Sequence, residues 1–153
     1  MADSFLNIRE LTLHYGGSQI LNGVDFEAAL GEVTCVMGTN GVGKTSLIKA
    51  ISGTHPRSGG TVQLQGEALG ILPAHKLAHK GIAYVPQGRM IFSSMTVQEN
   101  VETGLTVTGE TTVPPDIYEL FPVLLDMKSR RGGNLSGGQQ QQLAIARALA
   151  SRP

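Results

Sequence analysis

The stretch GTNGVGKT, residues 38–45, decides which fold this sequence can adopt. It fits the pattern G-x-x-x-x-G-K-[ST], follows the short apolar run GEVTCVMG at 31–38, and precedes apolar residues at helical spacing. Glycines allow the backbone to adopt positive φ, and successive N–H groups at a helix start form a concave site for an anion. The sequence therefore predicts a buried strand over 31–38, a phosphate-binding loop, and a helix that ends near Gly53.

Separate chemical roles are predicted for the residues of this loop. Lys44 supplies a point charge for β- and γ-phosphates, and the Thr45 hydroxyl is placed to join the coordination shell of Mg²⁺. The backbone from Asn40 to Gly43 is expected to cradle phosphate, and Gly38 to set the turn. The predicted nucleotide-contacting residues of the loop are Gly38, Asn40, Gly41, Val42, Gly43, Lys44, Thr45 and Ser46.

Composition excludes several classes of protein. The 12 basic and 12 acidic side chains of the 153 residues cancel, so the chain has no electrostatic footprint for nucleic acid. No apolar run approaches the roughly 18 residues that a membrane span needs, and the first ten residues do not resemble a secretory signal. We therefore expect a cytoplasmic protein whose membrane role would come through a partner. Cys35 is expected to be a buried thiol inside the strand at 31–38. His75 and His79 are expected on an exposed polar helix face rather than at a zinc site.

The remaining pattern predicts strands in the first half of the chain and helices in the second. The segments predicted as further strands are 5–13, 20–30, 61–66 and 81–88, with a turn at 15–18. Those predicted as helices are 73–80, 116–121, and the residues that follow Thr96 and Ser136. Thr96 and Glu99 have the spacing of a capping box. The whole is a two-lobed α/β arrangement.

A second motif, LSGGQ, occupies residues 135–139. Ser136 is a good helix N-cap, and Gly137 and Gly138 would expose backbone donors at the positive end of the helix dipole. The residues that follow are apolar on most sides of the helix, which predicts burial. The alternative is a capped core helix without a ligand.

The phosphate-binding loop, the VPQ sequence at 85–87 and LSGGQ together resemble an ABC-type ATPase. The resemblance implies an α/β P-loop NTPase fold with an N-terminal antiparallel β lobe, a partial RecA-like core, a helical signature subdomain and an incomplete central sheet. The whole chain, 1–153, would be a partial ABC ATP-binding domain. Its parts would be a β lobe and P-loop core over about 1–87, a helical subdomain over about 88–135, and a signature helix over 136–153.

The same resemblance implies roles for further residues. Gln87 would be the Q-loop glutamine, which reaches Mg²⁺ and the attacking water and links the two lobes, so that Lys44 and Gln87 are the catalytic candidates and Thr45 and Gln87 the metal candidates. Tyr15 would stack on adenine. The residues expected to contact the γ-phosphate of ATP held by a second subunit are Ser136, Gly137, Gly138 and Gln139.

Within the family, the chain resembles the ATP-binding subunits of bacterial importers for branched-chain amino acids and urea, and the glutamine run at 139–142 favours urea. The implied partners are ATP with Mg²⁺, a second ATP-binding subunit, and integral membrane permease subunits at the cytoplasmic face of the inner membrane. Met90 and the pair Ser93-Ser94 depart from the usual residues near the expected permease contact. Two alternatives are a non-transport ABC ATPase of the DNA-repair or translation type, and a non-catalytic nucleotide-binding fragment.

In this family the Walker B aspartate and the catalytic glutamate would follow residue 153. We therefore expect the chain to bind ATP without hydrolysing it and to fold poorly by itself. The strands expected at 33–37 and 82–85 would lack neighbours between them, which would leave apolar faces exposed.

Overall fold

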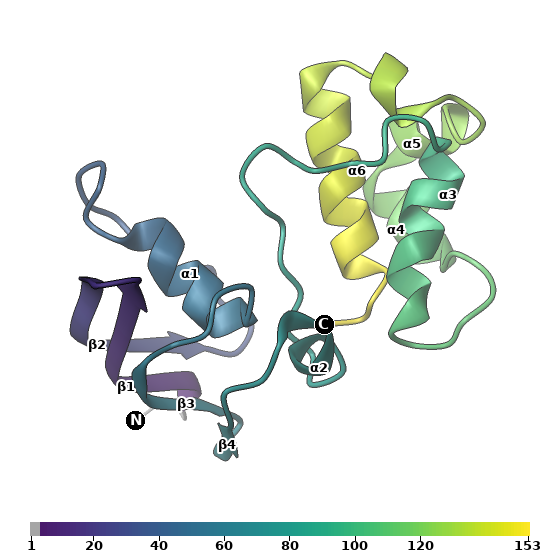
Figure 1. The fold of residues 1–153 in the computed structure, drawn as a ribbon. Helices are drawn as coiled ribbons and strands as arrows, with labels where there is room; N and C mark the ends of the chain where they lie inside the picture. The colour runs from purple at the N-terminus through teal and green to yellow at the C-terminus, as the bar shows by residue number, and fades with distance from the viewer. Residues whose placement is uncertain (1–3) are drawn as a thin grey trace. The chain divides into compact units, whose positions relative to one another are not determined.

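The computed structural model describes residues 4–153, which divide into two compact units, 4–76 and 77–153. The first unit holds the strands and the second holds most of the helices, as the sequence predicts (Figure 1). Helix α2 (Ala74–Ala78) spans the boundary between the units. The finer subdivision at about 87 and 135 stays a prediction.

The first unit is built on one antiparallel sheet. Strands β1 (Ser4–Tyr15) and β2 (Ser18–Ala29) form a hairpin, and β3 (Gly59–Leu64) and β4 (Glu67–Leu69) extend the sheet in the order β2-β1-β3-β4. All three pairings are antiparallel. This sheet confirms the strands predicted over 5–13, 20–30 and 61–66.

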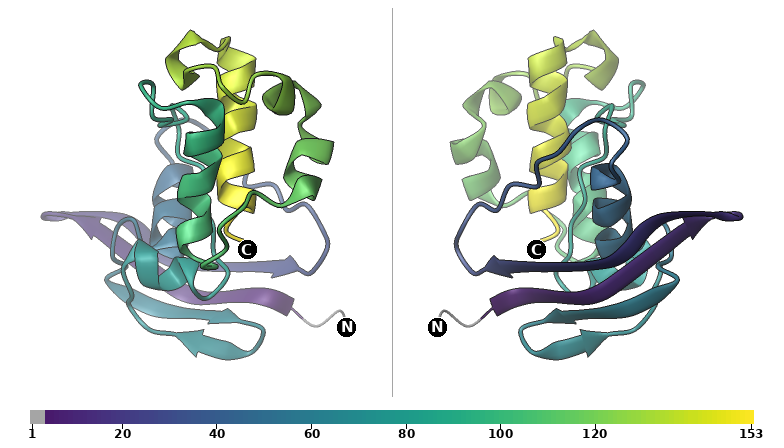
Figure 2. Two further views of the ribbon diagram at one scale, coloured as in Figure 1. Left: turned by 90° about the vertical axis from the view of Figure 1, so that its right-hand side faces the viewer. Right: turned by 90° about the vertical axis from the view of Figure 1, so that its left-hand side faces the viewer.

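Helix α1 (Lys44–Ser52) lies over one face of this sheet (Figure 2). It ends at Gly53, which has a φ of 70°, so the predicted glycine stop is confirmed. The buried apolar side chains of this unit come from the sheet and from α1, and they are Ile8, Leu11, Leu13, Leu21, Leu47, Ala50, Val62 and Leu69.

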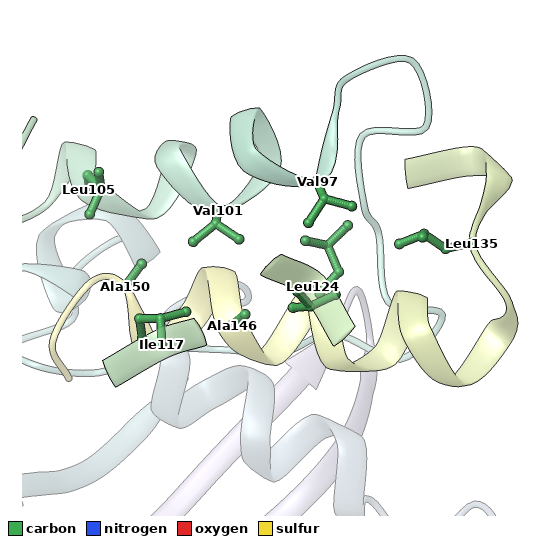
Figure 3. Close-up of a cluster of buried hydrophobic side chains, with 9 residues drawn as sticks. Val97, Val101, Leu105, Ile117, Leu124, Leu135, Ala146 and Ala150 are labelled. Atoms are coloured by element: carbon green, nitrogen blue, oxygen red, sulfur yellow. The ribbon is translucent and has the colours of Figure 1, made fainter. Parts of the chain in front are cut away.

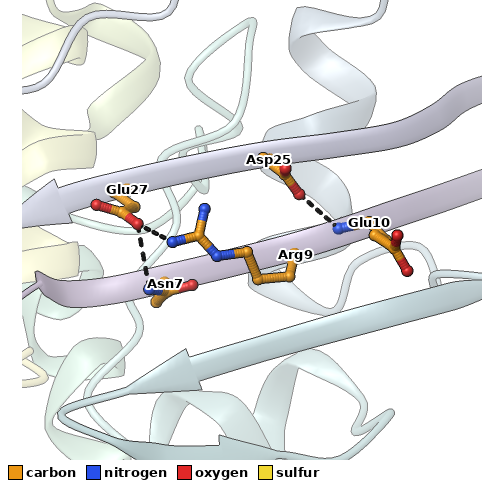
Figure 4. A network of polar contacts seen from close by, with 5 residues as sticks. All are labelled: Asn7, Arg9, Glu10, Asp25 and Glu27. Atoms are coloured by element: carbon orange, nitrogen blue, oxygen red, sulfur yellow. Dashed lines mark hydrogen bonds and ion pairs between the residues drawn. The ribbon is translucent and has the colours of Figure 1, made fainter.

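Polar contacts join β1 and β2 across an exposed part of the hairpin (Figure 4). Arg9 pairs with Glu27, which also accepts a hydrogen bond of 3.3 Å from the Asn7 amide, and the Glu10 N–H donates to Asp25 Oδ1 at 2.7 Å. Exposed ion pairs contribute only about 0–1 kcal/mol. The stability of the hairpin therefore comes mainly from its buried side chains.

The second unit is helical. Its elements are α3 (Val97–Glu102), the 3₁₀ turn η1 (Thr103–Thr106), α4 (Pro115–Leu120), α5 (Pro122–Asp126), the 3₁₀ turn η2 (Gly132–Asn134) and α6 (Gly137–Leu149). Figure 3 shows the apolar cluster that α3 to α6 enclose, and its members are Val97, Val101, Leu105, Ile117, Leu124, Leu135, Leu143, Ala146 and Ala150. The capping box at Thr96 and Glu99 is present at the start of α3, as predicted. None of the helices in residues 4–153 has the length and apolar character that crossing a membrane requires.

The prediction of a buried strand at 31–38 is wrong. Residues 32–39 have no regular secondary structure, and Val33 and Met37 are 94% and 88% exposed. Cys35, predicted to be buried, is exposed as well. An apolar run forms a strand only where a neighbouring strand pairs with it, and no described segment pairs with this one.

The predicted strand at 81–88 is also absent. Residues 82–86 have no sheet partner among the described residues, although their side chains are half-buried. The same physical reason applies, because the ladder of hydrogen bonds that defines a strand needs a neighbour.

Candidate functional site

The phosphate-binding loop joins the unpaired segment 32–37 to α1. Gly43 is the N-cap of α1, with a φ of 107°, and a Cβ built on it would lie 2.9 Å from Leu21 Cδ2. A Cβ on Gly38 would lie 2.9 Å from Val42 Cγ1. Larger residues at either glycine would therefore displace a neighbouring side chain, and Gly43 also needs the positive φ that glycine adopts without strain.

Lys44 lies across this loop. Its Nζ donates to the carbonyl oxygens of Gly38 at 2.8 Å and Thr39 at 2.7 Å. An ammonium group has three N–H donors, so one stays available for an incoming oxygen. The side chain thus holds a positive charge over the loop, where the sequence predicts phosphate.

The start of α1 supplies unpaired backbone donors beside that charge. The first helical hydrogen bond runs from Leu47 N to Gly43 O at 2.9 Å, so the N–H groups of Lys44, Thr45 and Ser46 precede it. Helix N-termini attract anions through these N–H groups and through the helix dipole. Thr45 is exposed, whereas the Ser46 side chain is buried.

Tyr15 stands at the end of β1, in the same unit as the loop. It is 39% exposed, and its ring centroid lies 4.3 Å from that of His55 at an interplanar angle of 36°. The other strand of this hairpin carries Ile20 and Leu21, which lie against Gly43. Tyr15 is therefore on a hairpin that adjoins the loop. His55 is not recognisable as a partner of Tyr15 from the sequence, because no local pattern signals a ring contact 40 residues away.

The signature residues begin α6 in the second unit. Ser136 Oγ accepts a hydrogen bond from Gln139 N at 3.3 Å, and Gln139 Oε1 accepts one from Ser136 N at 2.9 Å, a complete capping box. The predicted N-cap role of Ser136 is confirmed. Gly137 and Gly138 are exposed, and nothing lies within 4 Å of the position of a Cβ on Gly138. Ligand binding at these residues stays a prediction.

Gln87 lies in an exposed turn of the second unit, closed by a hydrogen bond of 3.1 Å from Arg89 N to Pro86 O. The structure thus groups the predicted residues in two sets. Tyr15 and residues 38–46 belong to the first unit, and Gln87 and residues 136–139 belong to the second. In residues 4–153 no group of three or more His, Cys, Asp or Glu side chains could hold a metal ion, and His75 and His79 are exposed as expected.

Comparison with known proteins shows the family of this chain. A sequence model described as ABC transporter matches residues 21–153, so the chain belongs to the ABC transporter family. BraG of Pseudomonas aeruginosa, named as a high-affinity branched-chain amino acid transport ATP-binding protein, is 39% identical over 151 residues, which are 97% of this chain and 65% of BraG. FbpC of Streptomyces avermitilis, named as an Fe(3+) ions import ATP-binding protein, is 36% identical over 152 residues, which are 97% of this chain and 43% of FbpC.

Solved structures support the same family. The ADP conformation of MJ1267, an ATP-binding cassette of an ABC transporter, aligns with a TM-score of 0.80 and 29% identity over 98% of this chain and 66% of MJ1267. The predicted fold, a partial ABC ATPase with an antiparallel β lobe and a helical part, is thereby confirmed. The chain spans about two-thirds of the length of BraG and less than half of that of FbpC.

Proposed function

We propose that the chain is the nucleotide-binding part of an ABC importer subunit and that it binds Mg-ATP through residues 38–46 and Tyr15. The observation that carries this proposal is the position of Lys44, whose ammonium is held by two loop carbonyls at the N-terminus of α1. The charge, the free donor and the unpaired N–H groups are together before any ligand arrives. Such preorganised donors bind phosphate oxygens without rearrangement of the loop.

The proposed Mg²⁺ ligands are the Thr45 hydroxyl in the first unit and the Gln87 side-chain carbonyl in the second. Both are uncharged oxygen donors, which suit a hard cation that keeps waters and phosphate oxygens in its shell. When bound, the ion supplies neutralisation of the charge on the phosphates. Lys44 holds the phosphate oxygens in place, and Tyr15 offers an aromatic face for adenine.

The signature residues 136–139 act on a second subunit in this proposal. Ser136 is used as the cap of α6, so the exposed N–H groups of Gly137 and Gly138 are the donors free for the γ-phosphate of ATP bound elsewhere. A head-to-tail pair of such subunits would hold two nucleotides between one phosphate-binding loop and the other signature. Permease subunits would then place the pair at the cytoplasmic face of the inner membrane.

The transported solute is proposed as a branched-chain amino acid or urea. The similarity to BraG over nearly the whole chain supports the first, and the glutamine run at 139–142 supports the second. FbpC is similar over the same span, so iron import is the competing outcome. Uptake of branched-chain amino acids, urea and Fe(3+), measured in cells that lack this gene and in the same cells after the gene is restored, distinguishes the three solutes.

Calorimetric titration of the purified chain with Mg-ATP tests the nucleotide site. We expect binding in the micromolar to submillimolar range that Lys44→Ala weakens by at least about tenfold, since a charge-assisted bond contributes about 1.5–3 kcal/mol. Lys49→Ala is the matched control, because Lys49 lies in the last turn of the same helix. Unchanged affinity in Lys44→Ala would contradict the proposal. Phosphate release in the same samples tests the expectation of binding without turnover.

A further inference from the structure

The segment that follows Gln87, residues 88–92, is held against helix α6 by Arg147. The Arg147 Nη2 donates to Met90 O at 3.0 Å and to Arg89 O at 3.4 Å. Its Cζ lies 5.3 Å from the centroid of the Phe92 ring. Burial lowers the pKa of Arg147 by desolvation, but a guanidinium stays charged at any physiological pH. One side chain of α6 thus contacts three residues of this segment, Arg89, Met90 and Phe92.

The segment adopts a backbone conformation that needs such support. Arg89 and Met90 have φ values of 67° and 47°, in the left-handed region that side-chain-bearing residues rarely adopt. Strained residues of this kind persist where their surroundings hold them, and they gather at functional sites. The two carbonyls that accept from Arg147 belong to these two residues.

Buried Asn100 fixes the far end of the segment. Its Oδ1 accepts from Phe92 N at 2.8 Å, and its Nδ2 donates to Phe92 O at 2.9 Å. The strained residues Arg89 and Met90 are therefore fixed by Arg147 and are followed by an anchored residue.

The Arg89 side chain makes a second contact with α6, at the signature itself. Its Nη1 donates to Gln140 Oε1 at 2.9 Å, and a Cβ on Gly137 would lie 3.4 Å from the same nitrogen. Gln140 Nε2 in turn donates to Gly132 O at 3.3 Å. The segment after Gln87 therefore contacts α6 at its first turn and again near its last, and all these contacts lie within the second unit.

We propose that Arg147 is a positioning residue that keeps segment 88–92 in its strained conformation and so joins Gln87 to the signature residues 136–139 as one rigid body. The assignment of Gln87 and of the signature to nucleotide rests on the proposed function, but the rigid link does not. If both roles hold, Gln87 moving toward the nucleotide of its own subunit also moves the signature N–H groups. Those N–H groups contact the nucleotide of the other subunit. Arg147 would thus couple two nucleotide sites without touching either.

The distance between spin labels at positions 87 and 141 tests this link. Gln87→Cys and Gln141→Cys, in a Cys35→Ser chain, place both labels on exposed positions of the second unit. Double electron–electron resonance should give a narrow distance distribution. Arg147→Met removes both donated bonds, and we expect it to broaden the distribution at least about twofold, with the circular dichroism of the helices unchanged. Arg147→Lys keeps a cationic donor, so its distance distribution should be narrower than that of Arg147→Met. If the broadening came only from lost packing, Arg147→Lys would be as broad as Arg147→Met.

Two controls separate this inference from the proposed function. Arg130→Met removes an exposed arginine of the same unit and should leave the distribution narrow. Lys44→Ala should lose Mg-ATP binding and keep the narrow distribution, while Arg147→Met should keep the binding. A distribution that stays narrow in Arg147→Met would overturn the inference. A broad distribution in the chain with its native Arg147 would overturn it even if the variants did not fold.

Discussion

Asn100 shows how one residue organises the helical unit. It is fully buried, and besides its two bonds to Phe92 its Nδ2 donates to Thr96 O at 2.8 Å. Asn100→Ala removes the acceptor of the Phe92 N–H and one of the two donors to the Phe92 C=O, which also accepts from Met95 N at 3.2 Å. We expect the free energy of unfolding, from urea titration, to fall by about 1–3 kcal/mol, because a hydrogen-bonding group left unpaired in the protein costs about that much. Gln98→Ala, an exposed amide on the same helix, should change it by less than about 1 kcal/mol, and a similar loss in both variants would contradict this account.

Glu99 makes the stability of the helical unit depend on pH in the acid range. The Thr96 N–H donates to the Glu99 carboxylate at 2.7 Å, and the Thr96 hydroxyl donates to it at 2.9 Å. These two bonds, the N–H bond more than the hydroxyl bond, lower the pKa of Glu99. Because the pKa of Glu99 is lowered in the folded chain, its carboxylate stabilises the fold at pH values above the ordinary glutamate pKa. This stabilisation is lost as pH falls through the lowered pKa. Urea titrations from about pH 7 to about pH 3 should show stability falling less in Glu99→Gln than in the native chain. Glu119→Gln, at an exposed position of α4, should keep the native slope, and equal slopes in all three chains would count against the capping box as the cause.

At the scale of elements, the sequence predicts those whose signals are local. Gly53 ends α1 and Ser136 begins α6 because a left-handed glycine and a capping hydroxyl act within one turn of their own helix. The predictions of strands at 31–38 and 81–88 are wrong because a strand is defined by the neighbouring strands that pair with it. No local sequence pattern shows whether such neighbours are present. Among the candidate site residues, the loop and the signature are recognisable from spacing. The contacts of His55 and Arg147 are not, since their partners lie about 40 and 57 residues away.

Close packing between η1 and α6 depends on Gly104. A Cβ on this residue would lie 2.2 Å from Arg147 O and 3.0 Å from Ala150 Cβ. Gly104→Ala must therefore push the two elements apart, and we expect thermal and urea unfolding to show a loss of at least about 2 kcal/mol. Gly138→Ala, whose Cβ would enter open space, is the matched control and should stay within about 1 kcal/mol of the native chain. A Gly104→Ala chain of native stability would mean that η1 and α6 are not packed so closely.

The unpaired segment 32–37 makes Cys35 a reporter of strand formation. The thiol is exposed, so a disulfide reagent such as 5,5′-dithiobis(2-nitrobenzoic acid) should modify it in the native chain about as fast as in urea. A Cys35→Ser chain should show no reaction. Slow modification that speeds up only on unfolding would instead mean that residues 31–38 form the buried strand that the sequence alone predicts.

At the scale of the whole molecule, each compact unit has buried apolar side chains of its own. The cluster in the second unit is formed by residues between 97 and 150, and the buried apolar side chains of the first unit come from the sheet and α1. Parts of a chain that each enclose a core of their own are able to open independently, and their amides then exchange with independent free energies.

Paired core substitutions should expose this independence. Leu124→Ala in the helical cluster and Leu11→Ala in the sheet each remove a fully buried leucine, at a cost of about 2–5 kcal/mol. Hydrogen exchange measured by mass spectrometry should accelerate in peptides from 77–153 for the first variant and in peptides from β1 to β3 for the second. Leu120→Ala, an exposed leucine of α4, should accelerate neither. Equal acceleration of both regions by either core variant would mean that the two units unfold as one, in which case the free energy stored in each core supports both the phosphate-binding loop and the signature helix.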